Sequence, residues 1–358
     1  MSEIKHRTVE TNGIHMHIAE SGAGPLVVLC HGFPESWYSW RHQLHALAEA
    51  GFHAIAPDMR GYGQTDRPEQ LDRYTLLHTV GDVVGLLDAL GTETAVIVGH
   101  DWGAPVAWYA ALLRPDRFRG VIGLSVPFRP RPPVRPTSIM PQTEDAQFFQ
   151  LYFQSPGIAE AEFERDVRLS IRSFLYSASG EGRDDGARDG REIDMVPRRG
   201  GFLSRLTNPA SLPHWLTEAD VDFYVSEFAR TGFRGGLNWY RNMDRNWELL
   251  APVSGVQVTV PALYIAGDRD LVLAFRGMDQ IIANLSKFVP QLRRTLLLPG
   301  CGHWTQQERA QEVNQAMIDF VRRLWASTKS VRTAACEFPE CIVGKPECMV
   351  RRFAASEK

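Results

Sequence analysis

The chain has few cysteines, no long apolar run and almost no net charge, and each shortage excludes a class of protein. Five cysteines in 358 residues do not make a disulfide framework, and the N-terminus carries charges where a secretory leader has its apolar core. No apolar run approaches the roughly 18 residues that span a bilayer. A net charge of -3 gives no field suited to nucleic acid or anionic membranes. We therefore expect a cytoplasmic protein without nucleic acid or membrane as a partner.

What remains is an ordinary globular composition, with 44% hydrophobic and 23% charged residues, and a length typical of about two domains. Apolar, strand-like runs alternate with stretches of helical period. This alternation predicts an α/β fold with a doubly wound, mostly parallel sheet, whose binding crevice lies at the carboxyl ends of the strands. We expect strands at 14–19 (an edge strand), 25–30, 53–57, 95–98, 120–126, 260–267 and 295–298, and helices at 40–50, 74–90 and 104–114.

Five residues, Gly99-His100-Asp101-Trp102-Gly103, lie between one of these strands and the helix that follows it. Glycine, any residue, nucleophile, any residue, glycine is typical of the strained turn that lifts its central side chain above the sheet. Here that residue is Asp101, and a carboxylate with a reference pKa of about 3.9 is already ionised at neutral pH. It could attack a carbon directly and form an ester with the enzyme. The same five residues also occur as an ordinary tight turn, so the rest of the chain must decide.

An acid and a histidine follow the last two predicted strands. Asp268 and Asp270 come directly after 260–267, and His303 follows 295–298. Nucleophile, acid and histidine in this order, each beyond a strand, are expected of an α/β-hydrolase triad. The histidine would activate water against the ester, and the acid would orient the imidazole and stabilise its cation. The residues from Thr305 to Glu308 also predict a capping box that opens the C-terminal helix.

Six prolines between 127 and 141 interrupt the alternation, because neither a helix nor a central strand tolerates that density. We interpret 127–250 as an inserted helical lid between two core segments, 1–126 and 251–327, with a tail at 328–358 that we expect to be disordered. Within the lid we expect helices at 146–153, 160–179 and 220–230 and a mobile loop at 180–201. Three cysteines in the tail fall short of a four-ligand zinc site. We expect no metal and no cofactor.

Several motifs together resemble those of the soluble epoxide hydrolases, over roughly residues 8 to 325. They are His31-Gly32-Phe33-Pro34-Glu35-Ser36-Trp37, Asp58-Met59-Arg60-Gly61-Tyr62-Gly63, the Asp101 pentapeptide, Gly235-Gly236-Leu237-Asn238-Trp239-Tyr240-Arg241-Asn242 and Cys301-Gly302-His303-Trp304-Thr305-Gln306. The resemblance implies an α/β-hydrolase fold and conversion of epoxides and water to vicinal diols. It implies Asp101 as nucleophile, His303 as base and Asp270, rather than Asp268, as acid. It further implies an oxyanion hole from the N–H groups of Phe33 and Trp102, a cis Phe33-Pro34 bond, and Trp37 and Phe149 in the substrate pocket.

An epoxide also needs a proton donor for its ring oxygen, and the family supplies two lid tyrosines. Tyr240 matches the second of these positions. The first departs from the pattern, because Phe149 stands there without a hydroxyl group. Tyr152 is one helical turn further on and could partly face the same crevice. We therefore expect Tyr240 as the principal acid and Tyr152 either as a helper or as a packing aromatic.

Two other functions stay open. A haloalkane or haloacid dehalogenase shares the Asp-His-Asp chemistry and binds the departing halide with N–H donors, one of which Trp102 could supply. A non-catalytic ligand-binding protein could use the same pocket without turnover, and the missing hydroxyl at Phe149 is compatible with that. Tyr240 favours the epoxide. The expected partners are a small-molecule epoxide and water, and a homodimer stays open.

Overall fold

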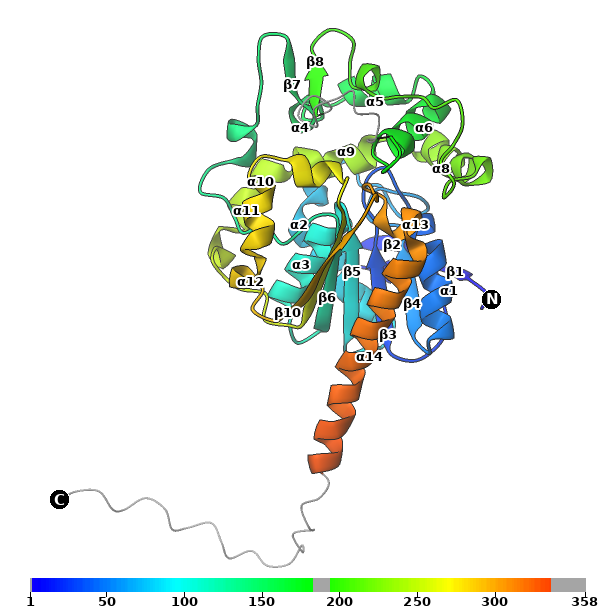
Figure 1. Cartoon of the computed structure of the whole chain (residues 1–358), viewed down its shortest axis with the longest axis vertical. Helices are drawn as coiled ribbons and strands as arrows, with labels where there is room; N and C mark the ends of the chain where they lie inside the picture. Colours follow the sequence, from blue (N-terminus) through cyan, green and yellow to red (C-terminus); the bar gives the residue numbers. More distant parts are fainter. Residues whose placement is uncertain (1, 183–193, 336–358) are drawn as a thin grey trace, which may run out of the picture.

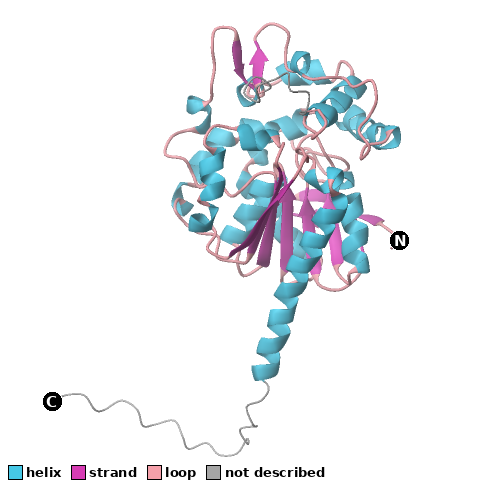
Figure 2. Ribbon diagram, in the orientation of Figure 1, coloured by secondary structure: helices cyan, strands magenta, loops and turns pink. Residues whose placement is uncertain are grey.

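This computed structural model describes residues 2–182 and 194–335, with side chains described as far as residue 326. The described residues form an eight-stranded sheet in the order β1-β2-β4-β3-β5-β6-β9-β10 (Figures 1 and 2). The strands are β1 (Lys5–Thr11), β2 (Ile14–Ser21), β3 (Leu26–Cys30), β4 (His53–Pro57), β5 (Ala95–His100), β6 (Phe118–Leu124), β9 (Ala262–Gly267) and β10 (Leu292–Leu298). β2 is antiparallel to β1 and to β4, and all other pairs are parallel. This confirms the predicted mostly parallel sheet.

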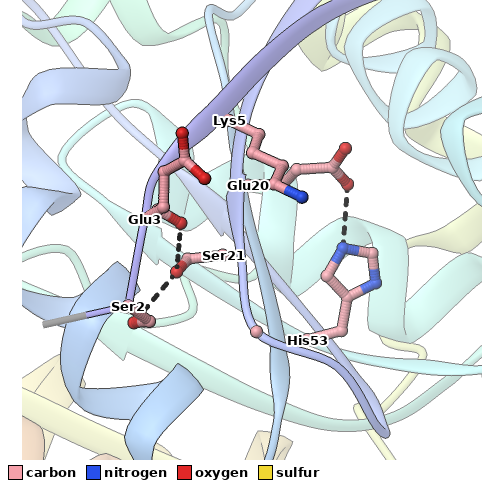
Figure 3. A pocket seen from close by; sticks show the side chains of 7 residues that line it. Ser2, Glu3, Lys5, Glu20, Ser21 and His53 are labelled. Atoms are coloured by element: carbon pink, nitrogen blue, oxygen red, sulfur yellow. Dashed lines mark hydrogen bonds and ion pairs between the residues drawn. The ribbon is translucent and has the colours of Figure 1, made fainter.

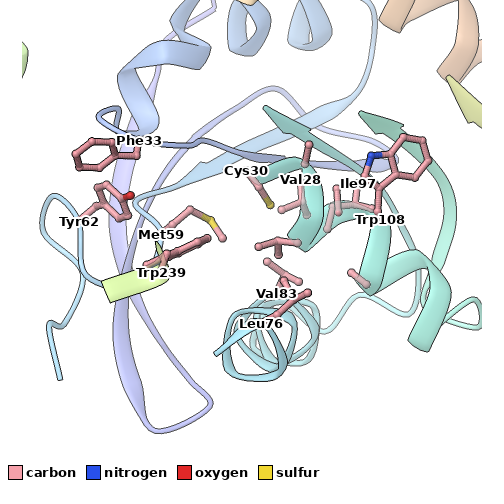
Figure 4. Close-up of a cluster of buried hydrophobic side chains, with 14 of the residues drawn as sticks. Val28, Cys30, Phe33, Met59, Tyr62, Leu76, Val83, Ile97, Trp108 and Trp239 are labelled. Carbon is pink, nitrogen blue, oxygen red and sulfur yellow. The ribbon is translucent and has the colours of Figure 1, made fainter. Parts of the chain in front are cut away.

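The central strands are buried on both faces because apolar side chains alternate between two helical layers. Val28 and Cys30 of β3 belong to the core under α2 (Leu76–Ala89) and α3 (Gly103–Leu113), which Figure 4 shows from close by. Val27 and Leu29 belong to the opposite core, with side chains from α1 (Arg41–Glu49) and α14 (Ala310–Ala335). Two cores on one sheet hold the carboxyl ends of β3, β5, β6 and β9 at a common edge.

The predicted edge strand at 14–19 is not at the edge. β1 pairs with β2 along its whole length, so β2 lies between β1 and β4. The sequence pattern did not predict β1, because this strand is polar and only its Val9 and Thr11 are buried. An outer strand with one exposed face does not show the apolar run by which the inner strands were found.

After β6 the chain leaves the sheet and returns only at β9, and the intervening elements cover the carboxyl ends of the strands (Figure 1). They are η3 (Pro136–Ile139), β7 (Ala146–Phe148), α4 (Phe149–Tyr152), α5 (Ile158–Phe163), α6 (Val167–Ser177), β8 (Met195–Pro197), η4 (Leu203–Arg205), α8 (Glu218–Thr231), α9 (Arg234–Arg241), α10 (Met243–Leu249) and η5 (Ala251–Val253). The predicted lid helix at 220–230 is confirmed as α8, which Thr217 caps and Gly232 follows.

Two other lid helices were predicted wrongly. The segment 146–153 is a short strand, β7, followed by a single turn, α4, because β7 pairs with β8. The segment 160–179 is divided into α5 and α6, because the side chain of Asp166 accepts a hydrogen bond from the backbone of Leu169 and begins a new helix there. The predicted loop at 180–201 contains β8, and its residues 183–193 lie outside the described residues.

The remaining elements lead from β9 to the end of the described chain. They are η6 (Leu271–Ala274), α11 (Met278–Ala283) and α12 (Leu285–Phe288) before β10, then α13 (Thr305–Glu308) and α14. The capping box predicted at Thr305 is not formed, because Trp304 occupies the N-cap and the Thr305 hydroxyl donates to Gln306. α14 continues to Ala335, past the predicted start of the tail at 328. The three tail cysteines lie outside the described residues.

Candidate active site

Asp101 stands on a strained turn directly after β5. Its φ of 49° is in the left-handed region, which residues other than glycine rarely adopt. The flanking glycines make the turn possible, since a Cβ on Gly99 would lie 2.0 Å from the carbonyl oxygen of Gly103, and one on Gly103 would lie 2.1 Å from that of Cys30. The turn at Asp101, called the elbow below, therefore packs so closely against β3 and α3 that neither glycine could carry a side chain. This is the strand–turn–helix context that the Gly-x-Asp-x-Gly pattern predicts.

Asp101, His303 and Asp270 come together at the carboxyl edge of the sheet. The Nδ1 atom of His303 lies 2.9 Å from Oδ1 of Asp270, and its Nε2 atom lies 3.6 Å from Oδ2 of Asp101. His303 and Asp270 are almost fully buried. Asp268, the other acid considered from the sequence, instead accepts a hydrogen bond of 2.7 Å from the backbone of Gly300 at the surface. The geometry therefore singles out Asp270.

The charges of the three side chains control one another. Burial alone would raise the pKa of Asp270, but the facing His303 outweighs it and holds that pKa below its usual value. Burial alone would lower the pKa of His303, but Asp270 and Asp101 together raise it well above 6.5. The two facing carboxyl groups therefore favour the protonated, cationic form of this histidine.

The loop after β3 contacts the Asp101 carboxylate oxygen that does not face His303. The backbone N–H of Phe33 donates a hydrogen bond of 2.8 Å to Oδ1 of Asp101. Gly32 is needed for this approach, since a Cβ there would lie 2.3 Å from the same oxygen. The Phe33-Pro34 bond is cis, as the resemblance implies. Trp102 directly follows Asp101 at the start of α3, where its N–H would complete the predicted pair of donors.

Tyr240 projects from α9 into the same region. Its ring lies 5.6 Å from that of Phe33 and 5.0 Å from that of Trp102, in both cases edge to face. Burial, and then the negative charge of Asp101, raises the pKa of the Tyr240 hydroxyl well above 10. The side chain is therefore a protonated donor at neutral pH, close to the predicted nucleophile.

Tyr152 does not support the helper role considered for it. Its hydroxyl donates a hydrogen bond of 2.7 Å to Oε2 of Glu162, and the Glu162 carboxylate also accepts the backbone N–H groups of Phe202 and Leu203. This hydroxyl is therefore hydrogen-bonded to another residue of the lid. Phe149 does lie beside Tyr240, with ring centroids 6.2 Å apart. The position that carries the family's first lid tyrosine is therefore at the site, and here it has no hydroxyl group.

Trp37 is also misplaced by the sequence prediction. Its ring packs edge-on against His6, Tyr38 and Phe223, at 4.7, 5.5 and 5.6 Å. It belongs to the core on the α1 side of the sheet and not to the aromatic cluster around Tyr240. The chain turns into the 3-10 helix η1 (Trp37–Trp40) soon after the Phe33 loop, and the Trp37 ring lies in this second core.

Ser125 is a site residue that the sequence analysis did not find. It follows β6 with a φ of 66°, is fully buried, and holds its Oγ atom 3.1 Å from Nδ1 of His303. Its backbone oxygen accepts a hydrogen bond of 2.7 Å from the Tyr264 hydroxyl. The sequence analysis placed Ser125 inside the predicted strand 120–126, whereas β6 ends at Leu124 and Ser125 follows it.

Glu35 and His100 form a second buried network that the sequence analysis missed. The Oε2 atom of Glu35 lies 2.8 Å from Nδ1 of His100, and Nε2 of His100 lies 2.8 Å from the backbone oxygen of His303. The amides of Gln306 and Gln307 donate to Oε1 of the same glutamate. All of these residues lie in or next to the quoted motifs, so their places in the motifs could have signalled a shared role.

One cavity at the surface of the described chain lies apart from the predicted site residues. A surface cavity of about 440 Å³ is lined by Ser2, Glu3, Lys5, Glu20, Ser21, Gly22 and His53 (Figure 3), and none of these is a predicted site residue. Among the described residues, no three or more His, Cys, Asp or Glu side chains gather in a way that could hold a metal ion. In the same residues, every helix is too short or too polar to cross a membrane.

Comparison with known proteins places this geometry in a family. Residues 25–310 match the family model described as alpha/beta hydrolase fold. Epoxide hydrolase A of Mycobacterium tuberculosis is 46% identical over 321 residues, which are 89% of this chain and 97% of that protein. The crystal structure of Epoxide Hydrolase A from Mycobacterium thermoresistibile is similar with a TM-score of 0.83 and 47% identity, over 89% of this chain and 98% of that one. An epoxide hydrolase from an endophytic Streptomyces is similar with a TM-score of 0.85 and 46% identity, over 90% and 96% of the two chains. This chain therefore belongs to the epoxide hydrolases of the α/β-hydrolase fold.

Proposed function

We propose that this protein converts epoxides and water to vicinal diols through an ester between the substrate and Asp101. The observation that carries the proposal is the position of Asp101, held on the elbow by Phe33 on one side and 3.6 Å from His303 on the other. The similar proteins, two of them of known structure, are named as epoxide hydrolases, which supports the same substrate class.

In the first half-reaction, the Asp101 carboxylate attacks a ring carbon of the epoxide. An Asp101–carbon bond forms while the ring C–O bond breaks, and the Tyr240 hydroxyl gives its proton to the departing oxygen. Without that proton an alkoxide, a poor leaving group, would have to develop unaided. The nucleophile needs no base, because the carboxylate is already ionised.

Formation of the ester releases His303 for the second half-reaction. Two carboxylates raise the pKa of this histidine, and esterification removes the charge of one of them. The pKa of His303 then falls, and the imidazolium releases a proton that replaces the one Tyr240 gave to the ring oxygen. The neutral imidazole then takes a proton from the water that attacks the ester carbonyl. Asp270, 2.9 Å from Nδ1, stabilises the cation that results.

The carbonyl oxygen of the ester gains negative charge during this attack. The Phe33 N–H, which already donates to Oδ1 of Asp101, would stabilise that charge together with the N–H of Trp102. Removing one such donor typically costs about 3 kcal/mol of transition-state stabilisation. Collapse of the intermediate breaks the bond between the carbonyl carbon and the diol oxygen. The hydroxyl proton that the attacking water brought passes to that oxygen, so the diol leaves and the Asp101 carboxylate is restored.

Isotope labelling tests this route. In one turnover in ¹⁸O water, the diol should be unlabelled and one Asp101 oxygen should carry the label, because water attacks the ester carbonyl and not the substrate carbon. In many turnovers the label should pass into the diol. Label in the diol of the first turnover would show direct attack of water and would overturn the proposal.

The dehalogenase alternative shares the nucleophile and the base, but it has no use for a buried proton donor. Tyr240 beside Asp101 therefore favours the epoxide. Diol formation without chloride release from a panel of haloalkanes would separate the two reactions, and any diol formation would exclude a purely ligand-binding protein.

A further inference from the structure

Glu308 is a buried carboxylate that the proposed mechanism does not use, and it holds the loop that carries His303. The backbone N–H of Gly302 donates 2.8 Å to its Oε2 atom, and the backbone N–H of Trp304 donates 3.0 Å to its Oε1 atom. One side chain therefore binds the peptide groups on both sides of the histidine. Such hydrogen bonds to an ionised acceptor are stronger than those between neutral groups.

The same carboxylate also binds the lid. The N–H of Gly180, which follows α6, donates 2.9 Å to Oε2 of Glu308. The N–H of His303 itself donates 2.8 Å to the backbone oxygen of Ala178, at the end of the same lid helix. The indole of Trp304 adds a hydrogen bond of 2.8 Å to the oxygen of Leu175.

The two backbone segments touch without side chains between them. A Cβ on Gly302 would lie 2.3 Å from the nitrogen of Gly180, and a Cβ on Gly180 would lie 2.1 Å from the oxygen of Gly300. This contact brings three N–H groups, from two segments more than a hundred residues apart in the sequence, to one carboxylate.

We propose that Glu308 is a positioning residue that fixes His303 for hydrolysis of the ester and ties the end of lid helix α6 to the same loop. The inference rests on the proposed function, because it assigns Glu308 to the second half-reaction. We call the three backbone hydrogen bonds to the Glu308 carboxylate the clamp. Attack by Asp101 does not need the histidine as a base, so loss of the clamp should slow hydrolysis of the ester and leave its formation unchanged.

Protonation gives this clamp a pH dependence. Burial raises the pKa of Glu308 to about 7, although the three N–H groups oppose the rise. The protonated acid carries a hydrogen on one of the oxygens that the N–H groups need, so the clamp is complete only above that pKa. The other titratable or charged side chains around it are Glu181 after α6, Asp268 and Arg269 after β9, Cys301 and His303 before α13, and Arg309 after it.

The test compares Glu308→Gln with Glu312→Gln, which removes an exposed acid that pairs only with Arg309 in the described structure. Rapid-quench mass spectrometry separates ester formation from hydrolysis. We expect Glu308→Gln to form the ester at the wild-type rate and to hydrolyse it about 10- to 100-fold more slowly at pH 8, as expected for a displaced catalytic group. The ratio of wild-type to variant hydrolysis rates should shrink below pH 7, and Glu312→Gln should match the wild type.

Equal slowing of both half-reactions, or a rate ratio independent of pH, would overturn the assignment. Hydrogen exchange supplies a readout that needs no substrate: Glu308→Gln should raise exchange in both 175–182 and 300–306, and unchanged exchange would also overturn it. If the glutamine variant does not fold, Glu308→Asp, one methylene shorter, is expected to show the same effects at smaller size, and wild-type behaviour would count against the clamp. Failure of the wild type to form any ester would contradict the proposed function alone, because the exchange measurement judges Glu308 independently.

Discussion

The Nε2 atom of His303 lies 3.6 Å from Oδ2 of Asp101, too far for a hydrogen bond but close enough for the two charges to interact strongly. In the proposed mechanism, this separation leaves the Asp101 oxygen available for attack, and His303 loses its second counter-ion only when the ester forms.

Replacement of the nucleophile should abolish ester formation. Asp101→Asn keeps the shape of the side chain and removes its charge, so the rate of diol formation should fall by about 10⁴-fold or more. Asp268→Asn is a matched control, because Asp268 caps Gly300 at the surface and has no place in the proposed mechanism. Wild-type turnover in Asp101→Asn would exclude this residue as the nucleophile.

Loss of the Tyr240 hydroxyl should slow ring opening. We expect Tyr240→Phe to lower the rate of ester formation by about 100-fold or more, the usual contribution of a general acid, and to leave hydrolysis of a formed ester nearly unchanged. Tyr152→Phe should leave both rates close to wild type, because that hydroxyl is bound to Glu162. Pre-steady-state quench experiments resolve the two rates. A larger loss from the Tyr152 variant would reverse the roles assigned to the two tyrosines.

A second hydroxyl can be added where the chain lacks one. Phe149 lies beside Tyr240, so Phe149→Tyr should place a second donor at the ring oxygen and raise the rate of ester formation several-fold. The gain should vanish in the double variant that also carries Asp101→Asn. No gain with any epoxide would mean that one donor is sufficient at this site.

The buried pair of His303 and Asp270 should make the free energy of unfolding fall as pH rises. The pKa of His303 is raised in the folded protein, so its contribution is complete below the unfolded value of about 6.5 and is lost as pH rises towards the folded pKa. The wild type should therefore lose more free energy of unfolding between pH 6 and 9 than His303→Gln does. Urea titrations at the two pH values measure this. An equal loss in both proteins would show that the pair does not stabilise the fold.

Most of the fold could be predicted because the inner strands carry their own signal. Residues 26–30 and 95–98 are apolar at every position, and the structure buries them between two helical layers. β1 escaped prediction because its side chains are mostly exposed and polar. The β7–β8 pair escaped because each strand has only three residues and its partner is distant in the sequence.

The proximity of Asp101, Asp270 and His303 could be predicted, because each of these residue types lies just beyond a strand. Prediction failed where a neighbour distant in the sequence decides the direction of a side chain. Helical spacing alone could place Tyr152 near the crevice, but only the folded lid shows that Glu162 binds its hydroxyl. Glu308 was assigned to a helix cap from its spacing, whereas the fold brings Gly180 to it from the lid.

Trapping of the ester in His303→Gln tests the central claim most directly. This variant keeps the Asp101 carboxylate and loses the base, so after incubation with an epoxide, mass spectrometry should find the whole mass of the substrate added to the peptide that contains Asp101. Absence of the adduct from every epoxide offered, in a folded variant whose wild-type parent turns those epoxides over, would contradict attack by Asp101.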